Sequence, residues 1–128
     1  MREAIQTEEA PAAIGPYSQA IKLTDFSSLA FFSGQIPLDP ATGKLVEGTV
    51  GDETTRVMQN LEAAITAAGF GLEDVVKTTI FLTDMADFSA VNEVYGGFFG
   101  ATPPARATVA VAGLPLGVHI EVEAICAR

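Results

Sequence analysis

The fold is decided by Pro104-Ala105-Arg106-Ala107-Thr108-Val109-Ala110-Val111-Ala112 and by the closing Val118-His119-Ile120-Glu121-Val122-Glu123-Ala124-Ile125-Cys126. Successive side chains of a β-strand point to opposite faces, and both stretches alternate in this way. We therefore predict strands over Arg106–Ala112 and Val118–Cys126. The apolar set of the closing strand should meet helices, and we expect a second, polar sheet face that carries Arg106, Thr108, Glu121, Lys77 and Thr79.

Two helices and a further strand are predicted upstream. Apolar residues recur at helical spacing over Thr49–Ala68, and Gly69 follows as a terminator. Val75–Thr83 is β-branched and aromatic with a period of two, as in a strand. Asp84 then offers an N-cap for a second helix, whose apolar positions are Phe88, Val91, Tyr95 and Phe98.

The N-terminal part predicts two strands and a turn. Tyr17–Thr24 and Leu29–Gln35 are the strand candidates, and Asp39–Gly43 has the composition of a turn. The resulting order, ββ-α-β-α-ββ, predicts an α+β fold in which one mixed sheet has two helices packed on one face. We expect residues 1–128 to form a single domain.

Composition and charge narrow the function classes. Sixteen acidic residues against seven basic ones give a net charge of -9, and this disfavours nucleic acid as a partner. No run reaches the roughly 18 apolar residues of a membrane span, and the start of the chain has no leader character, so we expect a cytoplasmic protein. Only 18% of the residues are charged, which favours burial of apolar surface between subunits.

Several kinds of chemistry lack the residues that they need. One His and one Cys without ligand spacing predict no metal site, and His119 and Cys126 are best interpreted as rim and core residues. No nucleophile elbow and no glycine-rich phosphate loop is present, so we expect neither an acyl-enzyme nor a nucleotide cofactor.

Arg106 is the leading candidate for a binding residue, and two interpretations of it are open. In a partly desolvated cleft, its guanidinium would hold a carboxylate through two parallel hydrogen bonds. On a solvated sheet face it would merely pair with Glu121 or Glu123. Tyr17 after Gly-Pro and Asn92 in the second helix are equally open, each as a cleft residue or as an ordinary surface residue.

Four segments, taken in order, resemble the RidA family of reactive-intermediate deaminases. They are Ala10-Pro11-Ala12-Ala13-Ile14-Gly15-Pro16-Tyr17, Ser33-Gly34-Gln35-Ile36-Pro37, Pro104-Ala105-Arg106-Ala107-Thr108-Val109 and Ile120-Glu121-Val122-Glu123-Ala124. The resemblance covers nearly the whole chain. It implies a chorismate-mutase-like α+β fold and a homotrimer with active sites between subunits.

The resemblance also implies an activity and a set of site residues. The activity is hydrolysis of 2-imino acids and their enamine tautomers, such as 2-aminoacrylate, 2-iminopropanoate and 2-iminobutanoate, to 2-keto acids and ammonia, without metal or organic cofactor. Arg106 would hold the carboxylate, Glu121 would position or activate water, and the pocket would be shaped by Tyr17, Ser33, Gly34, Asn92 and Thr108. The alternative is a non-catalytic trimer that binds small carboxylates. The chain departs from the family pattern at Ala110 and at Gly96-Gly97, so the preferred imine is not predicted.

Overall fold

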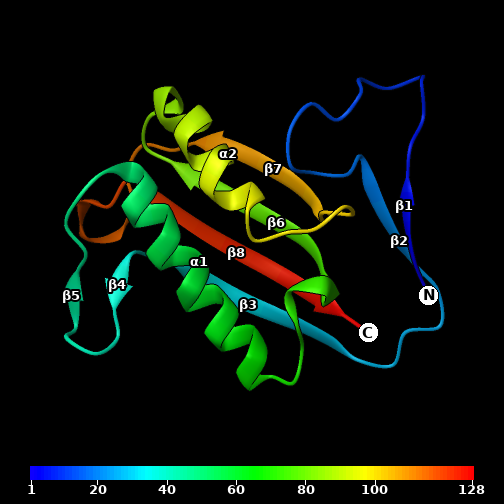
Figure 1. Ribbon diagram of the computed structural model, residues 1–128, viewed down its shortest axis with the longest axis horizontal. Coiled ribbons are helices and arrows are strands. Elements are labelled where there is room, and N and C mark those ends of the chain that lie inside the picture. The colour runs from blue at the N-terminus through cyan, green and yellow to red at the C-terminus, as the bar shows by residue number, and fades with distance from the viewer.

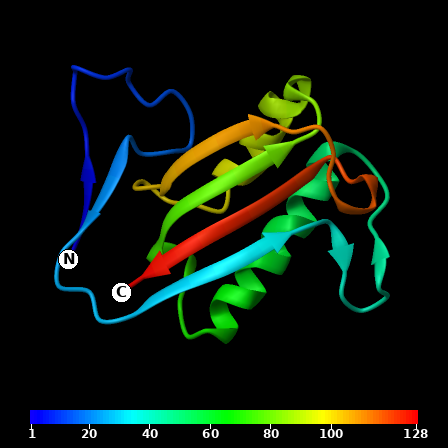
Figure 2. The ribbon, with the colours of Figure 1, turned by 180° about the vertical axis from the view of Figure 1, so that it is seen from behind.

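The computed structural model describes residues 1–128, and its centre is a four-stranded sheet with the order β3-β8-β6-β7. The strands are β3 (Leu29–Gln35), β6 (Val75–Leu82), β7 (Ala105–Ala110) and β8 (Ile120–Ala127). β8 is antiparallel to β3 and β6, whereas β6 and β7 are parallel, so the sheet is mixed. The helices α1 (Val50–Ala67) and α2 (Phe88–Gly96) cover one face (Figure 1), and the reverse view shows the other face uncovered (Figure 2). The predicted α+β fold class is confirmed.

Local sequence signals set the ends of α1 where they were predicted. Thr49 and Asp52 form a reciprocal capping box, in which the Asp52 amide donates to Thr49 Oγ1 and the Thr49 amide donates to Asp52 Oδ2. Gly69 follows the helix with a φ of 85°, a left-handed conformation that favours glycine. Neither α1 nor any other helix combines the length and the apolar character needed to cross a membrane.

The predicted N-cap of α2 is wrong by one turn. The Asp84 carboxylate accepts a hydrogen bond from the Ala86 amide at 2.9 Å and so caps a short 3-10 helix, Met85–Asp87, that precedes α2. α2 ends at Gly96, so Phe98 lies just beyond it. A capping side chain satisfies the nearest free amides whatever kind of helix follows, and Asp84 therefore could not reveal the 3-10 turn.

The N-terminal hairpin differs most from the prediction. The strand expected over Tyr17–Thr24 is shorter, β2 (Ala20–Leu23), and it pairs with an unpredicted strand, β1 (Arg2–Ile5), outside the main sheet. Figures 1 and 2 show this hairpin beside the β7 side of the sheet. Arg2 fastens it there by donating to the carbonyl oxygens of Glu73, Val75 and Thr102.

The remaining short elements connect the larger ones. The predicted turn at Asp39–Gly43 joins β4 (Leu38–Asp39) to β5 (Lys44–Leu45), and the Gly43 amide donates to the Asp39 carbonyl at 2.8 Å. Two further 3-10 turns are Leu72–Asp74 and Pro115–Gly117.

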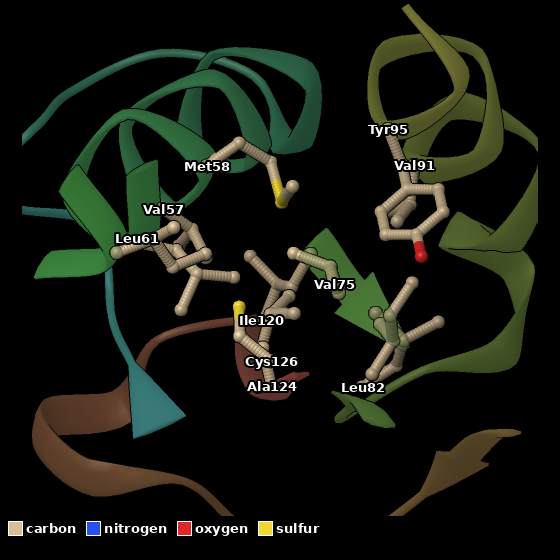
Figure 3. Packing of buried hydrophobic residues seen from close by; sticks show 13 residues of the cluster. Val57, Met58, Leu61, Val75, Leu82, Val91, Tyr95, Ile120, Ala124 and Cys126 are labelled. Atoms are coloured by element: carbon tan, nitrogen blue, oxygen red, sulfur yellow. The ribbon is translucent and has the colours of Figure 1, made fainter. Parts of the chain in front are cut away.

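The hydrophobic core lies between the helices and the sheet (Figure 3). As predicted, the apolar set of the closing strand, Ile120, Val122 and Ala124, faces the helices and is buried. The cluster contains 13 buried residues, and all of them come from the two helices and the two central strands, β6 and β8. The opposite sheet face has no such cover within the chain.

Candidate active site

Arg106 lies on the helix-covered face of the sheet, and this corrects the sequence analysis. In the parallel register of β6 and β7, Arg106 lies beside Thr78, and Thr108 lies beside Ile80. Thr78 and Ile80 are buried under the helices, so Arg106 and Thr108 lie on the same covered face. Glu121 alternates with the buried Ile120 and Val122 and therefore points to the uncovered face. The prediction that Arg106 and Thr108 share a face with Glu121 is wrong. Alternation shows which residues of one strand share a face. It does not show which face of the neighbouring strand lies on the same side of the sheet.

The guanidinium of Arg106 is enclosed by aromatic rings. Its Cζ atom lies 5.2 Å from the centroid of Tyr95, 5.3 Å from that of Tyr17 and 5.6 Å from that of Phe88. Arg106 Nη1 donates to Asn92 Oδ1 at 2.7 Å. Burial lowers the pKa of Arg106, but a guanidinium keeps its proton in proteins, so the site holds a fixed, partly desolvated positive charge.

No carboxylate of the chain neutralises this charge. The two ion pairs of the protein join His119 to Glu53 and Arg128 to Asp74. The interpretation that pairs Arg106 with Glu121 or Glu123 is therefore wrong for this chain. A half-buried cation with one neutral hydrogen-bond partner and further N–H groups is suited to bind an external carboxylate.

Tyr17 and Asn92 lie beside Arg106. Gly15, with a φ of 123°, reverses the chain so that the Tyr17 amide donates to the Gly15 carbonyl at 2.9 Å. A Cβ placed on Gly15 would lie within 4 Å of Tyr17, Asn92 and Arg106. The side chains converge, and their role toward a ligand stays a prediction.

Thr108 adds a free hydroxyl to the same sheet face. Its Oγ1 is the one buried side-chain oxygen or nitrogen that has no hydrogen-bond partner. A buried polar group without a partner costs about 1–3 kcal/mol, which a polar ligand atom can offset. We call the set Tyr17, Asn92, Arg106 and Thr108 the arginine half-site.

The other predicted residues gather on the uncovered face. β3 contains a bulge in which Ser33 and Gly34 both lie opposite Glu123, because Phe32 pairs with Ala124 and Gln35 pairs with Val122. The Glu121 side chain occupies the space beside Gly34, where any Cβ would collide with its carboxylate. We call the set Ser33, Gly34 and Glu121 the glutamate half-site.

Sequence reasoning missed two of the residues around Arg106. Phe88 and Tyr95 were treated only as apolar positions of a helix, and both pack against the guanidinium. The signal was present: Phe88, Val91 and Tyr95 share one helix face toward the sheet, so an arginine on the covered sheet face must meet that row. The contact was not predicted because the sequence analysis placed Arg106 on the uncovered face of the sheet.

Comparisons with known proteins agree with this architecture. The family model for Endoribonuclease L-PSP matches residues 7–128. A chloroplastic protein of Arabidopsis thaliana named Reactive Intermediate Deaminase A is 50% identical over 124 residues, which are 97% of this chain and 65% of the plant chain. The mouse protein named 2-iminobutanoate/2-iminopropanoate deaminase is 46% identical over 128 residues, which are 100% of this chain and 93% of the mouse chain. The crystal structure of E. coli TdcF with bound serine is 44% identical, with a TM-score of 0.76 and 98% coverage of each chain.

The matches identify a small α+β domain with two helices on one face of a mixed sheet as a known fold type. The chain belongs to the RidA family, the family of the Endoribonuclease L-PSP model, and it has the RidA-type fold that the four sequence segments implied. Members with deaminase names support imine deamination as the broad activity of this branch.

Proposed function

We propose that this protein hydrolyses reactive 2-imino acids and their enamine tautomers to 2-keto acids and ammonia, with 2-iminopropanoate and 2-iminobutanoate as substrates. The observation that carries the proposal is the half-buried Arg106, which has three aromatic walls and no carboxylate partner of its own. The serine bound in the TdcF relative also carries a carboxylate. An imino acid of this kind offers the planar anion that a guanidinium binds best.

In this proposal, each half-site has its own task. Arg106 holds the substrate carboxylate, and Tyr17, Asn92 and Thr108 line the space around it. Glu121 positions a water molecule and takes a proton as the water oxygen adds to the imine carbon. Glu121 returns this proton to the amine nitrogen of the resulting carbinolamine, the C–N bond breaks, and ammonia leaves as the hydroxyl loses its proton and becomes the carbonyl of the 2-keto acid. A protonated imine is already a good electrophile, so orientation and modest proton transfer can supply most of the acceleration.

The proposal includes a homotrimer whose sites lie between subunits. Arg106 and Glu121 are on opposite faces of the sheet, so the arginine half-site of one subunit needs the glutamate half-site of a neighbour. The uncovered face carries Phe31 and Val109, which are 72% and 42% exposed. Apolar side chains on an uncovered sheet face support burial against another copy of the chain. Residues 1–128 are proposed to act as one RidA-type domain in the cytoplasm.

A second candidate function is a trimer that binds small carboxylates without turning them over. It is supported by the composition of the arginine half-site, since Tyr17, Asn92, Arg106 and Thr108 include no carboxylate or histidine to serve as a base. Such a protein would bind 2-keto acids as well as the deaminase does, and it would leave imine lifetimes unchanged.

The deciding experiment couples a serine or threonine dehydratase to the purified protein and follows the decay of the transient imine. Wild type should accelerate the decay, and Arg106→Ala should lose at least about 100-fold of this acceleration, because a bidentate charge-assisted contact to the substrate disappears. Arg128→Ala is the matched control: it removes an arginine that pairs with Asp74, outside both half-sites.

The outcomes separate the two candidates. Acceleration by wild type and by Arg128→Ala but not by Arg106→Ala supports the deaminase. Binding of 2-oxobutanoate by wild type without any acceleration would favour the carboxylate-binding trimer. Full acceleration by Arg106→Ala would overturn the role proposed for Arg106.

A further inference from the structure

A pair of hydrogen-bonded hydroxyl groups lies inside the mainly apolar core. Thr78 Oγ1 and Tyr95 Oη share a hydrogen bond of 2.7 Å, and both residues are 0% exposed. Figure 3 shows Tyr95 extending from α2 toward the sheet with its hydroxyl at the tip. A valine and a phenylalanine would fill almost the same space without burying two hydroxyls. The hydrogen bond therefore fixes the orientation of the Tyr95 side chain relative to β6, which apolar packing alone does not require.

The pair lies directly against the arginine half-site. Thr78 on β6 is the register partner of Arg106 on β7, and the Tyr95 ring is 5.2 Å from the Arg106 Cζ atom. Thr78, Tyr95 and Arg106 thus form one contiguous set across β6, α2 and β7. Burial is the main reason why the pKa of Tyr95 is raised to about 12, so the phenol keeps its proton at physiological pH.

Tyr95 differs from the other two rings around the guanidinium. Tyr17 lies in a loop and Phe88 is the first residue of α2, and both are partly exposed. Tyr95 is fully buried, and its hydroxyl is held by a hydrogen bond to Thr78. A ring that is anchored at its backbone and at its hydroxyl has less freedom to tilt than a ring that is anchored at its backbone alone. The guanidinium of Arg106 therefore packs against a ring that is restrained from both ends.

We propose that Thr78 and Tyr95 are positioning residues of the carboxylate site, because their hydrogen bond holds the Tyr95 ring against Arg106 and so aims the free N–H groups of the guanidinium at the substrate. This inference rests on the proposed function. Both residues act through Arg106, and neither needs to touch the substrate. The loss of this support should weaken carboxylate binding in the ground state and the transition state alike, which raises KM and leaves kcat nearly unchanged.

The test compares Thr78→Val, Thr78→Ser and Tyr95→Phe in the dehydratase-coupled assay and in calorimetric titration with 2-oxobutanoate. We expect Thr78→Val and Tyr95→Phe to raise KM and the 2-oxobutanoate Kd by the same factor, on the order of 3- to 30-fold, because each leaves one buried hydroxyl unpaired and frees the ring. Thr78→Ser keeps the hydroxyl and should restore both constants to within about twofold. The double variant Thr78→Val/Tyr95→Phe should have a KM and a Kd no higher than those of either single variant, because both changes remove the same hydrogen bond.

Thr54→Val is the matched control for loss of stability. Thr54 is also a 0% exposed threonine, but its hydroxyl donates to the Val50 carbonyl within α1. It should lower Tm without changing KM or Kd. If Thr78→Val shifts Tm as Thr54→Val does and leaves KM and Kd at the wild-type values, the inference is overturned while the proposed function stands. If wild type neither turns over imines nor binds 2-oxobutanoate, the proposed function fails and takes this inference with it.

Discussion

At the scale of single residues, Gly34 decides where the Glu121 carboxylate can lie. The glycine sits in the β3 bulge, and any Cβ at this position would occupy the space that the carboxylate fills. The atoms in the way are the flexible end of a side chain and not the backbone, so the carboxylate can swing aside while the sheet stays intact.

Replacement of Gly34 by alanine should therefore impair activity more than stability. We expect Gly34→Ala to lower kcat at least about tenfold, since the group proposed to activate water is moved, and to change Tm by only a few degrees. Imine decay kinetics and thermal unfolding measure the two effects. Gly113→Ala, at a glycine with no atom within 4 Å of an added Cβ, should change neither. A loss of activity that only follows unfolding would contradict this explanation.

His119 predicts a pH-dependent contribution to stability. Its Nδ1 is 2.6 Å from Glu53 Oε2, and the His119 amide donates to Glu53 Oε1. The hydrogen bond to Glu53, and then the charges of Glu53 and Asp87, raise the pKa of His119 in the folded protein. Because the folded pKa lies above the unfolded value of about 6.5, the stabilisation is fully present below that value and is lost as the pH rises through the folded pKa.

Thermal unfolding between about pH 5 and pH 9 can measure this effect. We expect wild type to exceed His119→Gln in Tm by the largest margin at the acidic end, with the margin narrowing as the pH rises. A margin that is constant over the whole range would show that the charge of His119 contributes nothing.

At the scale of elements, hydrogen bonds from Arg2 and from Ser18 attach the N-terminal hairpin to the rest of the molecule, and Ser18 bonds the carbonyl oxygens of Pro103 and Pro104. Arg2 donates to the carbonyl oxygens of Glu73 and Val75, around the start of β6, and of Thr102, in the connection from α2 to β7. β2 of the same hairpin begins three residues after Tyr17, so the hairpin also helps to keep that ring over Arg106.

Removal of the Arg2 side chain should loosen the hairpin and leave the main sheet intact. Each of the three bonds contributes about 1 kcal/mol or more, and β1 has little buried apolar surface to replace them. We expect Arg2→Ala to speed amide hydrogen exchange at least about tenfold in residues 2–5 and 20–23, with no change in β6 and β8. Equal protection in the variant and in wild type would mean that strand pairing and the Ser18 hydrogen bonds are enough to hold the hairpin.

The elements also separate what was predictable from what was not. α1 and the closing strand carry their own signals, helical spacing with a glycine terminator and a strict alternation, and both were found within one or two residues. β1 was missed because Arg2-Glu3-Ala4-Ile5 has little buried surface to create a pattern. The resemblance named all seven site residues, of which only Ser33 and Gly34 had no earlier support from the sequence pattern. The division of these residues between two faces depends on the β6–β7 register, which no single strand encodes.

At the scale of the whole molecule, the uncovered sheet face should control assembly. Phe31 is the most exposed large apolar residue of that face, at 72%. We expect Phe31→Asp to shift the protein from the proposed trimer toward monomer in size-exclusion chromatography with light scattering, because a buried charge without a partner opposes association. Leu116→Asp is the control: Leu116 is 70% exposed but lies in the turn before β8. A Phe31→Asp variant that remains trimeric would place the interface elsewhere.

The placement of Arg106 and Glu121 on opposite faces has a consequence for mixtures of inactive chains. An Arg106→Ala subunit keeps its glutamate half-site, and a Glu121→Ala subunit keeps its arginine half-site. If the two variants are unfolded together and allowed to reassemble at random into the proposed trimer, about one quarter of the sites should combine two intact halves. Two preparations that are each inactive should then regain about that fraction of wild-type activity, and two genes that each fail alone should rescue a cell when they are expressed together.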